Sequence, residues 1–295
     1  MTSPADRVIT LKDGRRFGHV EYGDPAGEPT FYLHGSPGNR LNPFLDDWGR
    51  QCGVRFLSVD RPGYGCSSAH PGRRLSDIGD DLAQLADRLG LERFSLCGVS
   101  GGGPAVLAAA ARLGRRVRTA VVVSGVAPPQ APTEGTGASR LALLAAVRRN
   151  PGKHARQMGF AFWVARHLPA GVLDKAIAKG QADTPAPDRR LLEDEGVRRL
   201  LVAAARSLGH RDGRPMVADL ELTDQPWDVD LADVAAHVQL WHGGADTSVP
   251  VAAARYVAEQ LPDGHLHEVP DAGHLLFFQC WPEILAELVG AARSR

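Results

Sequence analysis

The sequence predicts an α/β protein in which a mostly parallel sheet has helices on both faces and carries an inserted helical cap. Three observations support this fold class. Short apolar runs alternate along the chain with segments of helical spacing. The runs are apolar throughout rather than at every second residue, which is typical of strands covered on both faces. Finally, residues 140–209 carry only helical patterns.

The first part of the chain supplies most of the predicted sheet. Residues 8–22 have the pattern of a β-hairpin that turns at residues 12–15. Residues 75–89 have helical spacing, and Ser76 is the expected N-cap of that helix. The other elements expected here are strands at Thr30–Leu33, Val54–Val59, Phe94–Cys97 and Thr119–Ser124, and a helix at Ala105–Leu113.

The sequence predicts two domains, because its pattern changes at about residue 127. Residues 127–225 form the expected helical cap, while residues 1–126 and 226–295 form the core. The cap begins in a linker rich in proline and glycine. Its expected helices are Leu141–Arg149, His154–Leu168, Val172–Lys179 and Leu191–Leu208, and the last core strands are Val238–Trp241 and Leu266–Val269.

Three aromatic residues form the least polar part of the cap: Phe160, Phe162 and Trp163. Two interpretations carry similar weight. The side chains line a substrate pocket, or they pack the cap onto the core. Only the first interpretation makes them candidate substrate-binding residues.

The composition is that of a globular protein without a strongly charged partner. Of 295 residues, 43% are hydrophobic and 23% charged, with 34 basic and 34 acidic side chains. This balance gives no electrostatic reason to expect binding to nucleic acid or to an anionic membrane. The sequence shows no signal-peptide pattern, no apolar stretch of membrane-spanning length and no CxxC pair among its four cysteines, so we expect a reduced cytoplasmic protein. The oligomeric state is not indicated.

The segment Gly98–Gly102 has the pattern Gly-x-Ser-x-Gly, with Ser100 at its centre. An apolar strand precedes it and an alanine-rich helix follows it, which is the context of a nucleophile elbow. The glycines allow the sharp turn, and the start of the helix points free N–H groups at whatever the serine attacks. A nucleotide-binding loop is excluded because no Gly-Lys-Ser/Thr follows. The sequence predicts neither a cofactor nor a metal.

A serine hydroxyl needs a base, and the base needs an orienting acid. His274 follows the last predicted strand directly after a glycine, and Asp246 follows the strand before it. The carboxyl ends of parallel strands share one sheet edge, so these residues are expected to meet Ser100 there. Asp263 and Asp271 are rival acids, but Asp271 is too close to His274 in sequence to approach its ring from behind.

Five segments together carry a family resemblance: His34–Gly38, Asp60–Gly65, Gly98–Gly102, Gly243–Asp246 and Gly273-His274. In order and spacing, the chain resembles an α/β-hydrolase over nearly its full length apart from the cap. The resemblance implies an eight-stranded sheet, with Ser100 as nucleophile, His274 as general base and then acid, and Asp246 as orienting carboxylate. It further implies an oxyanion hole built from the backbone N–H groups of Ser36 and Gly101.

A serine nucleophile argues against the dehalogenase and epoxide-hydrolase branches of this family, which use an aspartate. We therefore expect hydrolysis of a small-to-medium carboxylic ester through an acyl-enzyme, with amides and lactones as close alternatives. The loop at His34 also resembles prolyl aminopeptidases, but those typically carry a Gly-Gly-Ser-Trp-Gly elbow. Two alternatives of other classes stay open: a ligand receptor with little turnover, and a lyase or perhydrolase that uses the same site. In every case the expected partner is a small molecule.

Overall fold

The computed structural model describes residues 6–180, 182–208 and 212–293, and it confirms the predicted fold class. One sheet of eight strands has the order β1-β2-β4-β3-β5-β6-β7-β8. Strand β2 runs antiparallel to both β1 and β4, and the remaining neighbours pair in parallel. In chain order the strands are β1 (Arg7–Thr10), β2 (Arg16–Gly23), β3 (Glu28–Leu33), β4 (Val54–Val59), β5 (Phe94–Val99), β6 (Val117–Val123), β7 (His237–Gly243) and β8 (Gly264–Val269).

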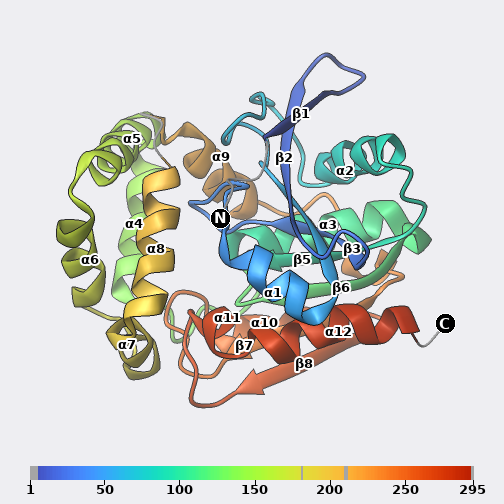
Figure 1. Ribbon diagram of the computed structural model, residues 1–295. Helices are drawn as coiled ribbons and strands as arrows, with labels where there is room; N and C mark the ends of the chain where they lie inside the picture. Colours follow the sequence, from blue (N-terminus) through green and yellow to red (C-terminus); the bar gives the residue numbers. More distant parts are fainter. Residues whose placement is uncertain (1–5, 181, 209–211, 294–295) are drawn as a thin grey trace.

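Helices cover both faces of this sheet, as Figure 1 shows. Buried side chains of α2, α3 and α10 pack on one face, and those of α1, α11 and α12 pack on the other. The strands between them are apolar on both sides, which explains their uninterrupted hydrophobic runs. The core helices are α1 (Phe44–Cys52), α2 (Asp77–Arg88), α3 (Gly103–Leu113), α10 (Val251–Gln260), α11 (Leu276–Gln279) and α12 (Trp281–Arg293).

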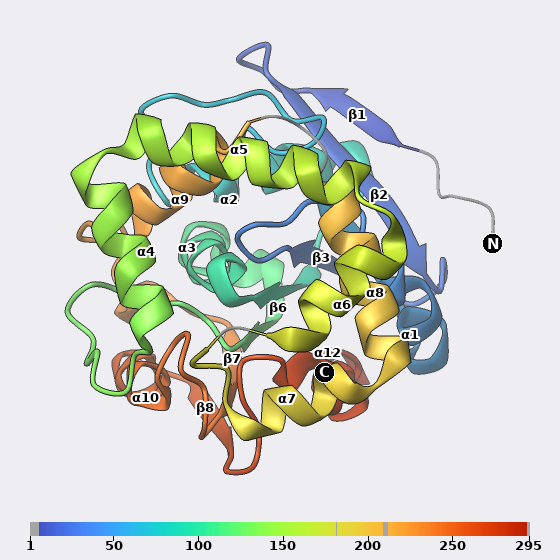
Figure 2. The same cartoon turned by 90° about the vertical axis from the view of Figure 1, so that its left-hand side faces the viewer.

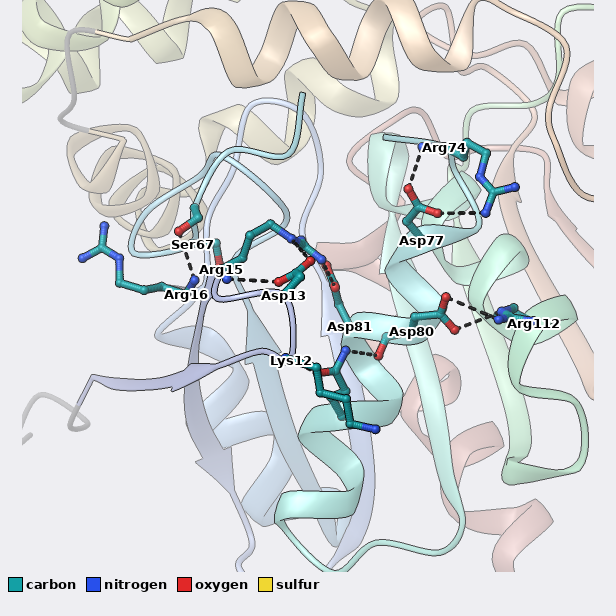
Figure 3. A network of polar contacts seen from close by, with 12 residues as sticks. Lys12, Asp13, Arg15, Arg16, Ser67, Arg74, Asp77, Asp80, Asp81 and Arg112 are labelled. Carbon is teal, nitrogen blue, oxygen red and sulfur yellow. Dashed lines mark hydrogen bonds and ion pairs between the residues drawn. The ribbon is translucent and has the colours of Figure 1, made fainter. Parts of the chain in front are cut away.

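An ion pair attaches the β1–β2 hairpin to α2 (Figure 3). Arg15, at the start of the second hairpin strand, donates hydrogen bonds of 2.9 and 2.6 Å to the carboxylate of Asp81 in α2. It also binds Asp13 within the turn, at 2.6 Å. A further pair joins α2 to α3, since Arg112 donates to Asp80 at 2.9 Å. These contacts fix the edge of the sheet that lies far from β8.

Between β6 and β7, the described residues form six α-helices in the segment predicted to form the cap. They are α4 (Ala138–Arg149), α5 (Pro151–His167), α6 (Ala170–Lys179), α7 (Ala186–Glu193), α8 (Glu195–Ser207) and α9 (Arg214–Thr223). In Figure 2, α4 to α8 frame the view, with α3 and the central strands behind them. The segment has an apolar cluster of its own, centred on Val147, Phe162 and Met216. The division into two domains at residues 127 and 225 stays a prediction.

One local prediction is wrong, and another holds only in part. The helix expected at Leu191–Leu208 is two helices, because Asp194 takes an extended conformation and its side chain accepts a hydrogen bond from the N–H of Val197 at 2.9 Å, capping α8. Ser76 occupies the predicted N-cap position of α2, but its side chain makes no capping hydrogen bond. Its hydroxyl donates to Asp228 instead, and so ties the start of α2 to the segment before β7. Within the described residues, no helix combines the length and apolarity that crossing a membrane requires.

Candidate active site

Ser100 stands in a strained turn between β5 and α3. Its φ of 53° is in the left-handed region, which a residue with a side chain rarely adopts. The flanking glycines are sterically required. A Cβ on Gly98 would lie 2.6 Å from Val106, and one on Gly102 would lie 2.1 Å from the carbonyl oxygen of Leu33. The turn is therefore tight enough to present the Ser100 hydroxyl at the carboxyl edge of the sheet.

A continuous chain of hydrogen bonds joins three of the predicted residues. Ser100 Oγ lies 3.0 Å from His274 Nε2, and His274 Nδ1 lies 2.7 Å from Asp246 Oδ2. Both distances fit a neutral imidazole that carries its proton on Nδ1, donates it to Asp246 and accepts from Ser100. The three residues follow β5, β8 and β7, so the parallel topology brings them to one edge.

Asp246 is buried, and several donors hold it ionised. Its Oδ1 accepts hydrogen bonds from the backbone N–H groups of Ser248 (2.8 Å) and Val249 (3.0 Å), and His242 Nε2 lies 3.4 Å from Oδ2. Burial works against ionisation, but the charge of His274 and the hydrogen bonds from both histidines outweigh it, so the pKa of Asp246 lies well below its usual value.

The interaction with Asp246 shifts the pKa of His274 in the opposite direction. Burial disfavours the imidazolium, whereas the charge and hydrogen bond of Asp246, and the charge of Asp188, favour it. The net effect raises the pKa of His274 above its ordinary value. A histidine of this kind accepts a proton from a nearby hydroxyl more readily, which is what a general base requires.

Ser36 and Gly101, the two predicted oxyanion residues, lie against each other beside Ser100. A Cβ on Gly101 would lie 3.2 Å from the backbone nitrogen of Ser36. Both residues line the same small cavity as Ser100. The loop after β3 reaches this position because β3 is the neighbour of β5 in the sheet.

A buried carboxylate that the sequence analysis missed holds the Ser36 loop in place. Asp219 of α9 accepts hydrogen bonds from Ser36 Oγ (2.9 Å) and from the hydroxyl of Tyr64 (2.6 Å). The guanidinium of Arg61 lies 2.7 Å from the same carboxylate oxygen, and Arg73 pairs with the other oxygen. Asp219 belongs to no recognisable motif, and the residues it joins lie more than 140 positions away in the chain.

A second missed carboxylate supports the His274 loop. Asp188 of α7 is only 3% exposed and accepts hydrogen bonds from the backbone N–H groups of His274 (2.9 Å) and Leu275 (3.0 Å). A Cβ on Gly273 would lie 2.4 Å from this carboxylate. The glycine before the histidine thus has a physical reason: it leaves room for a side chain from the inserted helices.

The rival residues lie elsewhere or have other partners. Asp263 pairs with His237 (3.0 Å) and His265 (3.2 Å), at the amino ends of β7 and β8 and therefore at the edge opposite Ser100. Asp271 is exposed. His34 is buried and bridges its own loop to the next, because its Nε2 accepts a hydrogen bond of 3.3 Å from the N–H of Arg61.

The group formed by His237, Asp263 and His265 is the one place in the described residues where at least three side chains could hold a metal ion. Their candidate ligand atoms all lie within 4.8 Å of one another. Because the group sits at the amino edge of the sheet, a metal bound there would not touch Ser100.

Two cavities adjoin the site. The one beside Ser100 is about 10 Å³ and is lined by Ser36, Ser100, Gly101, Val126, Arg140, Asp219, Leu220 and Thr223. A space of this size accommodates about one water molecule. Helices α4 and α9 supply four of these residues, so both helices border the hydroxyl of Ser100. A cavity of about 150 Å³ shares Val126, Arg140, Leu220 and Thr223 with it.

The three aromatic candidates do not line either of these cavities. Phe160 is 61% exposed, and its ring stacks on that of Trp163 at 6.0 Å between centroids. Phe162 packs into the apolar cluster of the inserted helices and lines a separate cavity of about 220 Å³ beside Pro37 and Tyr64. Their assignment to substrate binding finds no support at Ser100.

With this geometry established, comparisons place the chain in a family. The family described as alpha/beta hydrolase fold matches residues 31–279, and the chain belongs to it. An alpha/beta hydrolase fold protein from Nakamurella multipartita superposes with a TM-score of 0.72, covering 98% of this chain and all of that one. At 24% sequence identity, this likeness shows the shared fold alone.

Two of the curated relatives are named as an esterase and a carbamate hydrolase. The pimeloyl-[acyl-carrier protein] methyl ester esterase of Aromatoleum aromaticum is 44% identical over 73 residues, which are 24% of this chain and 29% of that protein. The chain thus matches less than a third of that relative's length. A putative carbamate hydrolase of a Caulobacter species is 29% identical over 233 residues, which are 75% of this chain and 74% of that protein. These likenesses support hydrolase activity.

Proposed function

We propose that this protein is a serine hydrolase that cleaves a small-to-medium carboxylic ester through an acyl-enzyme. The observation that carries the proposal is the hydrogen-bonded chain from Ser100 through His274 to Asp246, with distances of 3.0 and 2.7 Å. The esterase and carbamate hydrolase among its relatives support chemistry at an acyl carbon.

In the proposed mechanism, His274 Nε2 takes the proton of Ser100 as Oγ attacks the ester carbonyl. Asp246 holds the imidazole in the required tautomer and stabilises its positive charge. The tetrahedral oxyanion accepts hydrogen bonds from the backbone N–H groups of Ser36 and Gly101, each worth about 3–4 kcal/mol. His274 then protonates the departing alcohol, and the same residues activate a water molecule to release the acid.

The test is hydrolysis of p-nitrophenyl acetate and butyrate by the wild type and by Ser100→Ala. We expect the substitution to abolish the acyl-enzyme burst and to reduce turnover at least 10³-fold, on the order known for loss of a triad nucleophile. A fluorophosphonate should label Ser100, as located by mass spectrometry. Turnover that survives the substitution, or an adduct on another residue, contradicts the assignment. Saturable ligand binding without turnover of any ester points to a receptor instead.

A further inference from the structure

Arg140 connects the two cavities of the candidate active site. It lies in the first turn of α4 and lines both the small cavity beside Ser100 and the neighbouring cavity of about 150 Å³. A group that reaches from the Ser100 hydroxyl into the larger cavity must therefore pass the Arg140 side chain. No sequence motif singles out this arginine.

Within the described part of the chain, the charge of Arg140 is not matched by a salt bridge. Among the described residues, no carboxylate lies within 4.0 Å of its guanidinium. The two carboxylates that act on it electrostatically are Asp224 and Asp246, and both are already engaged. Asp224 accepts hydrogen bonds of 2.7 and 2.5 Å from Arg148, and Asp246 is held by His274. An arginine stays protonated in a protein, so an unmatched positive charge borders the site.

The opposite wall of the small cavity adds further positive charge. Asp219 also lines the small cavity, but its single carboxylate lies between the guanidinium groups of Arg61 and Arg73. That group of three side chains carries a net charge of +1. The carboxylates of Asp246 and Asp188 act on His274 and offset part of this positive charge, so an anionic group is favoured where it contacts Arg140 directly.

The larger cavity indicates what else the ligand contains. Its lining includes Val126, Ala127, Pro128, Leu144, Val249 and Ala253. Apart from Arg140, the charged side chains there are Arg148 and Asp224, which neutralise each other. An aliphatic chain fits such a wall, whereas a second charged group does not.

We propose that the substrate is an ester that carries one carboxylate, which Arg140 binds through paired N–H···O hydrogen bonds while the aliphatic chain lies along the larger cavity. One guanidinium with one unmatched charge suits a monoanion better than a phosphate dianion. This inference rests on the proposed esterase function and specifies its substrate class.

The test compares esters that differ only in the carboxylate, with rates followed by acid release in a pH-stat. Monomethyl glutarate and monomethyl adipate are set against methyl pentanoate and methyl hexanoate, in which a methyl group replaces the acyl-side carboxylate. The anion 3-acetoxypropanoate against propyl acetate tests a carboxylate on the alcohol side. The variants are Arg140→Gln, Arg140→Lys and, as a matched control on the same helix, Arg149→Gln. Arg149 is exposed and lines neither cavity.

We expect the wild type to prefer the anionic member of at least one pair. Arg140→Gln should lower the ratio of kcat/KM for that anion to kcat/KM for its neutral partner by about 10- to 100-fold, the range for a hydrogen bond to a charged group. Arg140→Lys should retain part of the preference, and Arg149→Gln all of it. Equal losses on both members, or a wild type that prefers the neutral members, overturn the inference.

Failure of the proposed function gives a different result from failure of this inference. If no ester in the set is hydrolysed and fluorophosphonate does not label Ser100, the esterase function itself is wrong. If neutral esters are hydrolysed through Ser100 without any anionic preference, only the role of Arg140 is wrong. Should Arg140→Gln fail to fold, as judged by circular dichroism, the Lys variant and the wild-type preference still decide the question.

Discussion

Replacing Asp188 with asparagine should displace the loop that carries His274 and should also remove a negative charge that raises the pKa of His274. The carboxylate of Asp188 accepts one hydrogen bond from each of two backbone N–H groups, those of His274 and Leu275, at 2.9 and 3.0 Å. An asparagine offers one acceptor oxygen and an NH₂ group. One of the two N–H groups must therefore face a donor, and the loop that carries His274 has to move or lose a bond.

The burial of Asp188 determines how much stability the substitution costs. Asp188 is 3% exposed, so water does not readily replace the missing acceptor, and a buried unsatisfied donor costs about 1–3 kcal/mol. The rate is more sensitive than the stability. His274 Nε2 lies 3.0 Å from Ser100 Oγ, and a displacement on the order of 1 Å costs about 10²-fold in rate. We expect kcat/KM to fall about 10- to 100-fold.

The assay is p-nitrophenyl acetate hydrolysis as a function of pH, with urea unfolding measured in parallel. Asp194→Asn is the matched control, because it makes the same chemical change at the exposed N-cap of the next helix, where asparagine caps equally well. A wild-type rate and pH profile in Asp188→Asn would refute the argument that α7 positions His274. So would an equal loss of rate in the control.

Three further outcomes are expected. Gly101→Ala places a Cβ 2.5 Å from Ser36 Oγ and so displaces one oxyanion donor. We expect kcat/KM for p-nitrophenyl butyrate to fall about 10²- to 10³-fold. A fall below threefold would exclude the two-donor oxyanion site. Because the pKa of His274 is raised, kcat/KM of the wild type should fall as pH drops through a value above 6.5. Asp246→Asn should lower kcat/KM by about 10³- to 10⁴-fold and should move this acidic decline of the rate to lower pH. An unshifted decline would contradict the pairing of Asp246 with His274. The same raised pKa means that the ionised pair stabilises the fold fully below pH 6.5 and loses that contribution as pH rises through the folded-state value. The wild type should therefore exceed His274→Gln in free energy of unfolding by more at pH 6 than at pH 9, as measured with urea.

The sequence by itself determined the sheet and the residues that meet at its edge. Strand β4 has the predicted bounds, and the residues at the ends of β5, β7 and β8 form the hydrogen-bonded chain. These predictions work because each depends on local sequence. An apolar run of strand length, a glycine pair around a serine and a glycine before a histidine all report the conformation of a few neighbouring residues.

Only the tertiary structure decided what the inserted helices bring to that edge. Asp188, Asp219 and Arg140 lie on three different helices, and none of them belongs to a motif or shows a period. Their partners are far away in the chain: Asp188 binds the backbone 86 residues later, and Asp219 binds Ser36 across 183 residues. A sequence does not show which backbone N–H groups or charges lack a local partner. The residues that pair with them can therefore be identified only from the packing of the helices.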